Sequence, residues 1–134
     1  MISLDTNLIL SALNPNDVNY TRALNALDTH AQQALCICPV VCAELRASGA
    51  WSAIHAWLNL QGVSVVWEMP ASVWESAGVA FGQYAVLRRA GSVPRRLVAD
   101  FLIAAHAQHH RLEVLTFDAT VFRAVFLGIT LLPC

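Results

Sequence analysis

The chain has 134 residues, of which 57% are hydrophobic and 13% charged, with a formal net charge of −1 and a mean hydropathy of +0.53. This length suits one domain, and the charge excludes a generally basic nucleic-acid-binding surface, although local arginine clusters can still contact phosphates. No secretory signal is evident, and the longest stretch without Asp, Glu, Lys or Arg, Ala47–Trp67, contains too many polar residues for a membrane span.

Apolar segments typical of strands alternate along the chain with segments of helical periodicity. The expected strands are 2–4, 34–40, 63–67, 113–117 and 129–132. The expected helices are 7–13, 17–33, 40–48, 50–60, 70–89, 95–110 and 119–126. Asp5 or Asn7 is expected to cap the first helix, Asp17 the second and Asp118 the last.

This alternation predicts an α/β fold in which helices cover both faces of a central sheet. We expect a three-layer α/β/α sandwich with a mainly parallel sheet of about five strands, formed by one domain over residues 1–134. Ligand sites in such sheets lie beyond the carboxyl ends of the strands, where the strand order reverses. Asp5, which follows the first apolar segment, is expected there.

The Cys and His residues do not form a recognisable metal site. Three of the four cysteines fall in the segment CICPVVC, with no second Cys or Cys/His pair elsewhere, so reduced thiols in a cytosolic core are expected. At about 100° per residue, the histidines that follow Asp100 lie off its helix face. A surface or interface position is expected for these residues, which are His106, His109 and His110.

Four carboxylates stand out among only nine acidic residues. Asp5 and Asp118 each follow an expected strand, whereas Glu44 and Asp100 lie in largely apolar surroundings. The two acids that follow strands are equally explained as helix caps. A buried, unpaired carboxylate is costly, so the apolar surroundings of Asp100 favour a metal site or a functional role.

Simpler explanations also exist for the other two acids. Glu44 can pair with Arg46, and Asp100 can pair with Arg96, which is four residues earlier. Taken together, however, several carboxylates in one cleft repel one another, and a divalent cation relieves that repulsion. A site of oxygen ligands suits Mg²⁺ or Mn²⁺, and such a site suits phosphodiester hydrolysis.

Four segments resemble the successive motifs of the PIN domain family, and in particular its VapC-type toxins. They are LDTNLIL, AEL at 43–45, ADFLIAAHA and TFDATVF, and their order and spacing agree over essentially the whole chain. The resemblance implies a PIN-like sandwich and a catalytic cluster of Asp5, Glu44, Asp100 and Asp118. It also implies that Asp5 and Asp100 hold Mg²⁺ or Mn²⁺, and that Thr116 supplies a hydroxyl group at the site.

The implied activity is a metal-dependent endoribonuclease that cleaves single-stranded or structured RNA, either tRNA or rRNA. The resemblance further implies a cytoplasmic toxin with a cognate antitoxin protein, a homodimeric assembly and no membrane partner. Arg95 and Arg96, together with Arg88 and Arg89, flank the segment AGSVP and are candidates for phosphate contacts near Asp100. The alternative is that these arginines form only a solvated helix end.

Other functions are compatible with parts of the pattern. A PIN-fold nuclease outside a toxin–antitoxin pair and a non-catalytic PIN binding module are the two alternatives, and the intact acid set weighs against the second. Dehalogenase-type phosphatases need a second Asp where this chain has Asn7, and they use a Lys. Receiver domains also rely on a Lys, and the chain contains no lysine.

Overall fold

A computed structural model describes all residues, 1–134, and places four strands in one parallel sheet. The strands are β1 (Ile2–Leu4), β2 (Leu35–Ile37), β3 (Ser64–Val65) and β4 (Glu113–Leu115), and their order is β3-β2-β1-β4. Strands β3 and β4 lie at the two ends of this order, whereas β1 lies inside the sheet and is paired with β2 on one side and β4 on the other.

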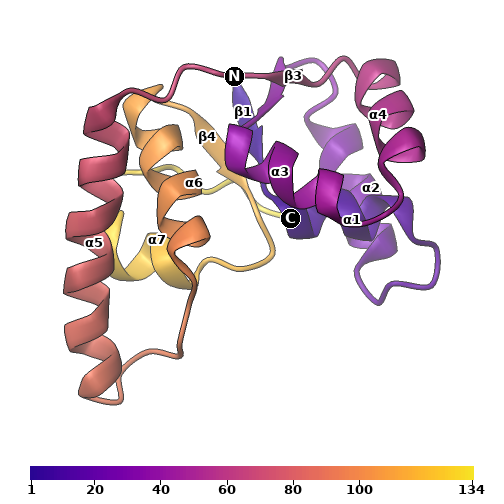
Figure 1. The fold of residues 1–134 in the computed structure, drawn as a ribbon. Coiled ribbons are helices and arrows are strands. Elements are labelled where there is room, and N and C mark those ends of the chain that lie inside the picture. Colours follow the sequence, from indigo (N-terminus) through magenta and orange to yellow (C-terminus); the bar gives the residue numbers. More distant parts are fainter.

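Seven helices cover the sheet (Figure 1). They are α1 (Thr6–Leu13), α2 (Tyr20–Thr29), α3 (Pro39–Ala47), α4 (Trp51–Leu60), α5 (Ala71–Arg89), α6 (Val98–His109) and α7 (Thr120–Val125). Helices α1 to α4 gather on one side of the sheet, and α5 to α7 gather on the other. The expected three-layer α/β/α architecture is therefore confirmed.

The two cores follow from the alternation of side chains along the strands. Leu35 and Ile37 of β2 point into the core beneath α1 to α4, whereas Cys36 between them joins the core beneath α5 to α7. In β4, Val114 and Leu115 divide between the two cores in the same way. Every residue of the central strands β1 and β2 is therefore buried, which contributes to the high hydrophobic content of the sequence. All four cysteines are free.

The strand order reverses between β1 and β4. The chain passes from β1 to β2 and then to β3 on one side, and later returns to pair β4 with the other side of β1. Asp5 directly follows β1, and its backbone N–H donates to the carbonyl of Leu115, the last residue of β4, at 3.0 Å. The segments that follow β1 and β4 therefore leave the sheet side by side, where open α/β sheets form ligand sites.

The expected fifth strand, 129–132, is reduced to a single bridge between Val114 and Leu131. Backbone hydrogen bonds join Val114 to Thr130 and to Leu132 at 3.0 and 2.9 Å, but the next residue is Pro133, which has no N–H to extend the ladder. Strand β3 is also shorter than the expected strand 63–67. The sheet consequently has four strands in place of about five.

Two helix starts also differ from expectation. Helix α2 begins at Tyr20, and the Asp17 carboxylate accepts the backbone N–H of Asn19 at 2.7 Å in a turn before the helix. Helix α6 begins at Val98, because the preceding residues are extended. No helix in the structure has both the length and the apolar character that a membrane span needs.

The surface position expected for His106 is wrong, because this residue is fully buried beneath the segment that joins β3 to α5. Its Nε2 atom donates to the carbonyl of Val66 at 2.8 Å, and His110 makes a similar bond to the carbonyl of Glu68 at 2.7 Å. Val66 still donates its backbone N–H to the carbonyl of Ile37 at 3.1 Å, but its own carbonyl accepts from His106. His109, in contrast, is exposed.

Candidate active site

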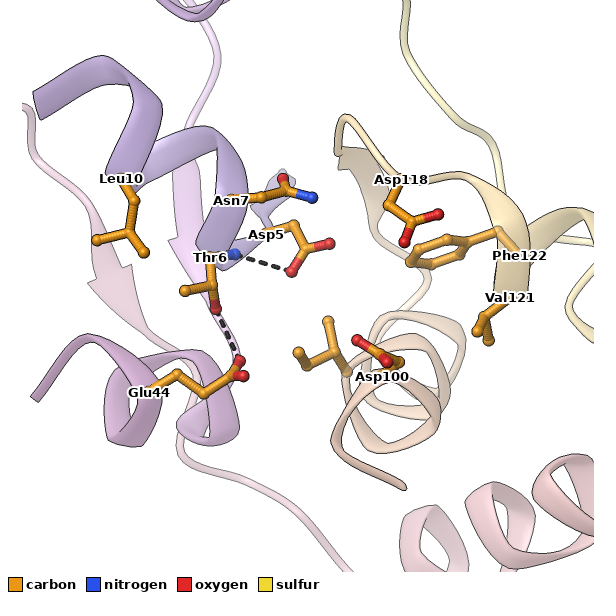
Figure 2. Close-up of a pocket in the computed structure, with 10 residues that line it drawn as sticks. Asp5, Thr6, Asn7, Leu10, Glu44, Asp100, Asp118, Val121 and Phe122 are labelled. Carbon is orange, nitrogen blue, oxygen red and sulfur yellow. Dashed lines mark hydrogen bonds between the residues drawn. The ribbon is translucent and has the colours of Figure 1, made fainter. Parts of the chain in front are cut away.

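All four predicted acids line one cleft of about 230 Å³ at the carboxyl ends of β1 and β4. Asp5 and Asp118 come from the segments after these strands, Glu44 from α3 and Asp100 from the first turn of α6. Figure 2 shows Asp5, Asp100 and Asp118 facing a common space, with Glu44 beside Thr6. The remaining lining residues are Thr6, Asn7, Leu10, Ile103, Val121 and Phe122.

Asp5 is the N-cap of α1, as one of the expected alternatives stated. Its Oδ1 atom accepts the backbone N–H of Thr6 at 2.8 Å, and its Oδ2 atom accepts the Thr116 hydroxyl at 2.7 Å. Burial raises the pKa of Asp5, the two hydrogen bonds oppose that rise, and the charges of Asp100 and Glu44 add to it. The net pKa is above the ordinary value, mainly because the carboxyl group is buried.

Thr116 joins the two segments that form the floor of the cleft. Besides donating to Asp5, its hydroxyl oxygen accepts the backbone N–H of Asp118 at 3.0 Å. Asn7 completes the connection, because its side-chain oxygen accepts the backbone N–H of Phe117 at 3.3 Å. Thr116 is only 7% exposed, so its hydroxyl acts as an internal support for the carboxylates.

Glu44 is the most exposed of the four acids and does not pair with Arg46. Its Oε1 atom accepts the hydroxyl of Thr6 at 2.7 Å, so α1 holds the carboxylate that α3 supplies. This contact leaves Oε2 directed to the open side of the cleft without a hydrogen-bond partner in the protein.

Asp100 lies in the first turn of α6, where the helix dipole favours negative charge. Its Oδ2 atom accepts the backbone N–H of Leu97 at 3.2 Å, and it forms no ion pair with Arg96. Burial raises the pKa of Asp100, the Leu97 bond lowers it, and the charge of Asp118 raises it again, so that the net shift is upward.

Arg96 instead forms the one ion pair of the structure, with Asp118, at an Nε–Oδ2 distance of 2.9 Å. The Asp118 Oδ1 atom accepts the backbone N–H of Thr120 at 3.1 Å, so Asp118 supports the start of α7 although Ala119 is the N-cap. Burial raises the pKa of Asp118, but the hydrogen bonds from Thr120 and the contact with Arg96 outweigh burial and lower the net pKa.

Of the predicted phosphate contacts, only Arg96 touches an acid of the cleft. Arg95 does not line that cleft; it lies with Arg88 and Arg96 around a separate hollow of about 240 Å³ beside α5. Tyr84, at the back of this hollow, donates its hydroxyl to the carbonyl of Pro94 in a short hydrogen bond. That bond anchors the segment that carries both Arg95 and Arg96.

Sequence reasoning missed the supporting roles of Thr6, Asn7 and Tyr84. Thr6 and Asn7 are polar residues directly after Asp5 in an otherwise apolar segment, and that position was the available signal. Tyr84 gave no such signal, because its partner is a backbone carbonyl of a loop that only the tertiary structure brings close.

The donor set fits a hard divalent cation. No three Asp, Glu, His or Cys side chains are gathered closely enough to enclose an ion by themselves. Mg²⁺ does not need such a cage, because it keeps several waters and is commonly held by one or two carboxylates and substrate phosphates. Asp5 and Asp100 each present such a carboxylate to the cleft, and the pKa of each is raised, mainly by burial.

Comparison with known proteins gives one matching family. The model of the PIN domain family matches residues 2–126 of the chain. No match is found among curated protein sequences.

Three similar solved structures illustrate the likeness in fold. FitAcB from Neisseria gonorrhoeae is 22% identical, with a TM-score of 0.69 and coverage of 99% of this chain and 97% of that one. VapBC2 from Rickettsia felis, bound to a promoter DNA fragment, is 23% identical, with a TM-score of 0.65 and 98% coverage of each chain. VapC20 from Mycobacterium tuberculosis, described as a sarcin–ricin loop cleaving toxin, is 18% identical, with a TM-score of 0.69 and coverage of 92% and 95%. The family match over most of the chain and the shared fold establish that the chain belongs to the PIN domain family.

Proposed function

We propose that this protein is an Mg²⁺- or Mn²⁺-dependent endoribonuclease, with Asp5, Glu44, Asp100 and Asp118 as its catalytic acids. The observation that carries the proposal is their convergence on one cleft from four separate segments, at the point where the strand order reverses. Asp5 and Asp100 are half-buried and have no ion-pair partner, and unneutralised carboxylates in such surroundings are costly. Such an arrangement is expected only if a cation or substrate compensates for the repulsion.

The chain's own residues would divide the work as follows. Asp5 and Asp100 would hold the cation. The Thr116 hydroxyl orients the Asp5 carboxylate, and the backbone N–H of Leu97 orients the Asp100 carboxylate. Glu44, held through Oε1 by Thr6, uses its other carboxylate oxygen to accept a proton from the attacking water. The cation supplies activation of that water and stabilisation of the charge that develops on the phosphate. The expected products carry a 5′-phosphate and a 3′-hydroxyl.

Asp118 has a different environment, because Arg96 and Thr120 occupy its two oxygens. Within the catalytic set, Asp118 would act together with Arg96, which it holds beside the cleft, where the guanidinium can also contact a substrate phosphate. Arg95 would contact a more distant phosphate. Single-stranded or looped RNA suits the small cleft, because a duplex interior does not present its backbone to such a site.

The direct test is RNA cleavage by purified protein with Mg²⁺ or Mn²⁺ and with EDTA. Asp5→Asn and Asp100→Asn should each abolish cleavage while keeping the fold, as judged by circular dichroism. A matched control is Asp28→Asn, which changes an exposed acid on α2 away from the cleft. Cleavage at the wild-type rate by both cleft variants at saturating Mg²⁺ would refute the proposed site.

We further propose that the protein is a cytoplasmic toxin with a small antitoxin protein, in one domain that spans residues 1–134. The support is that two of the similar solved structures are VapBC2 from Rickettsia felis and FitAcB from Neisseria gonorrhoeae. Co-expression with the product of an adjacent short reading frame should suppress growth arrest and RNA cleavage. A harmless gene product with no such neighbour would favour a PIN nuclease with another role.

A homodimer is part of the same proposal. Helix α5 exposes apolar side chains that a monomer has no reason to keep, among them Trp74, Val79 and Val86, which are 54%, 65% and 58% exposed. Light scattering on a size-exclusion column should give twice the monomer mass of 14.6 kDa. A monomer at all concentrations would remove the dimer from the proposal and leave the nuclease intact.

The second candidate function is a non-catalytic binding module. It predicts no Mn²⁺-dependent rise in melting temperature and no cleavage of any RNA. Thermal unfolding with and without Mn²⁺ separates the two, because a ligand that binds only the folded state raises the melting temperature.

A further inference from the structure

The largest cavity of the structure is a second groove, of about 770 Å³, on the other side of the loop that bears Asp118. Its walls are the loop 116–120, the α7 residue Arg123, the α2 residue Arg22 and the extended segment 131–134. Loop residues Thr116 and Asp118 belong also to the environment of the catalytic cleft. The groove therefore adjoins the proposed active site at Asp118, which lines both hollows.

Arginine side chains outnumber acidic side chains among the residues that line this groove. Arg22 and Arg123 both line it, and the only acidic side chain among its lining residues is Asp118, which Arg96 neutralises. Arg123 is exposed and makes no side-chain hydrogen bond or ion pair within the protein. A guanidinium in this position has its full set of donors available to a phosphate.

Arg22 is held more firmly and forms part of the groove wall. Its guanidinium lies 4.9 Å from the centre of the Phe117 ring, and it donates to the Asn19 side chain at 3.0 Å and the Cys134 carbonyl at 2.9 Å. These two bonds use two of its five N–H donors, so donors remain for a ligand. The wall thus holds a cation in a fixed position over the Phe117 ring, where its remaining N–H donors can contact a phosphate.

We propose that this groove, named here the Arg22–Arg123 groove, binds the phosphodiester backbone of single-stranded RNA on one side of the scissile bond. The inference rests on the proposed nuclease function and deepens it by giving the strand a path. From the cleft the strand passes over the loop 116–120, and Arg123 contacts a phosphate within the groove. Because the strand is held beyond the reacting phosphate, the groove adds affinity without taking part in bond cleavage.

RNA fits these observations better than a peptide of an antitoxin. A polymer that is cut in the catalytic cleft must leave it on both sides, and the groove adjoins one side of the cleft at Asp118. The groove also has unpaired cationic donors and a polar loop, whereas a docking site for an apolar helix needs a row of apolar pockets. An acidic peptide remains an outcome that the experiment can detect.

The test uses the full chain with Arg123→Gln, Arg123→Lys and Arg111→Gln. Arg111 is a matched control, because it is an exposed arginine that precedes β4, at the opposite end of the sheet from the cleft. Fluorescence anisotropy measures binding of a labelled single-stranded RNA of mixed sequence in EDTA, and cleavage of the same RNA in Mg²⁺ gives kcat and KM.

Arg123→Gln should weaken RNA binding roughly three- to tenfold and reduce the slope of log Kd against log salt concentration by about 0.7, the value for one lost phosphate contact on a single strand. It should raise KM and leave kcat unchanged, because the contact is equal in ground and transition states. Arg123→Lys should restore most of the affinity, and Arg111→Gln should behave as wild type. Photocrosslinking of RNA that contains 4-thiouridine should label peptides of the groove.

The groove assignment alone would be overturned if Arg123→Gln bound and cleaved RNA as the wild type and Arg111→Gln do, and if no crosslinks formed in the groove. Loss of antitoxin binding in Arg123→Gln with unchanged RNA affinity would also overturn it, in favour of a peptide site. A wild-type protein that neither binds nor cleaves RNA would overturn the nuclease proposal itself, and the groove assignment with it.

Discussion

Replacement of Thr116 by valine tests whether one buried hydroxyl organises the carboxylates of the cleft. Valine has nearly the same shape as threonine, so the substitution leaves no cavity and removes only the hydroxyl group. The hydroxyl donates to Asp5 at 2.7 Å and accepts the backbone N–H of Asp118 at 3.0 Å. Both partners lose a hydrogen bond at once, and the Asn7 side-chain amide, which donates to the same hydroxyl at 3.4 Å, loses its acceptor.

The expected loss of stability is about 2–4 kcal/mol at neutral pH. A hydrogen bond to a charged group contributes about 1.5–3 kcal/mol, and a buried N–H left without a partner costs about 1–3 kcal/mol. Some solvent access at Asp5 and Asp118 keeps the total below the sum of the upper limits. Thr116→Ser retains both bonds and loses one methyl group, so its cost should be no more than about 1 kcal/mol.

The measurement is urea unfolding in metal-free buffer at pH 7 and at pH 3. The hydroxyl bond lowers the pKa of Asp5, so its loss raises that pKa further. At pH values above the raised pKa, the Asp5 carboxylate of the variant is charged without its hydroxyl partner, so the destabilisation is complete. At pH values below the ordinary pKa of 3.8, the carboxyl group is protonated in the folded and the unfolded state, so the difference in stability between variant and wild type becomes smaller. The reasoning is refuted if Thr116→Val is as stable as wild type at pH 7, or if Thr116→Ser is equally destabilised.

Three further predictions concern single titratable groups. Asp5→Asn should raise the urea midpoint at pH 7 without metal, because burial and the charges of neighbouring acids such as Asp100 raise the Asp5 pKa. This gain in the urea midpoint should vanish at pH 3, and a lower midpoint than wild type at pH 7 would contradict the prediction. Burial lowers the pKa of His106, so wild-type stability should fall as the pH drops below about 6.5, and His106→Gln should flatten this slope in melting curves from pH 7 to 5. Arg96→Gln should lower the free energy of unfolding by less than about 1 kcal/mol, because the ion pair with Asp118 is partly exposed. It should also raise the Asp118 pKa measured by NMR titration, and an unchanged Asp118 pKa would show that the pair does not persist in solution.

Most of the architecture could be predicted from local pattern. Asp5 ends an apolar strand and caps α1, and both features lie within a few residues of the sequence. Helix α5 was predicted almost to its ends because Pro70 and Ala90–Pro94 mark them. The fifth strand and the burial of His106 could not be predicted, because each depends on which distant backbone lies opposite.

The site shows the same division. The four acids and Thr116 were selected from their positions in the sequence and from the resemblance to PIN domains, and their catalytic role stays a prediction. The ion pair of Arg96 with Asp118, in place of the helix pair with Asp100, could not be selected in this way. Residues before α6 are extended, so Arg96 is not one helical turn from Asp100 and reaches across to the loop after β4.

The sequence by itself determined the alternation of strands and helices, the position of each acid within its segment and the family to which the chain belongs. These properties depend on residues that are neighbours along the chain or on motifs in a fixed order. Only the tertiary structure decided which acid meets Arg96, how Thr116 joins two of the acids, and that a second groove, lined by Arg22 and Arg123, adjoins the cleft. Those outcomes depend on the parallel pairing of β1 with β4, which brings residues more than one hundred positions apart to the same edge of the sheet.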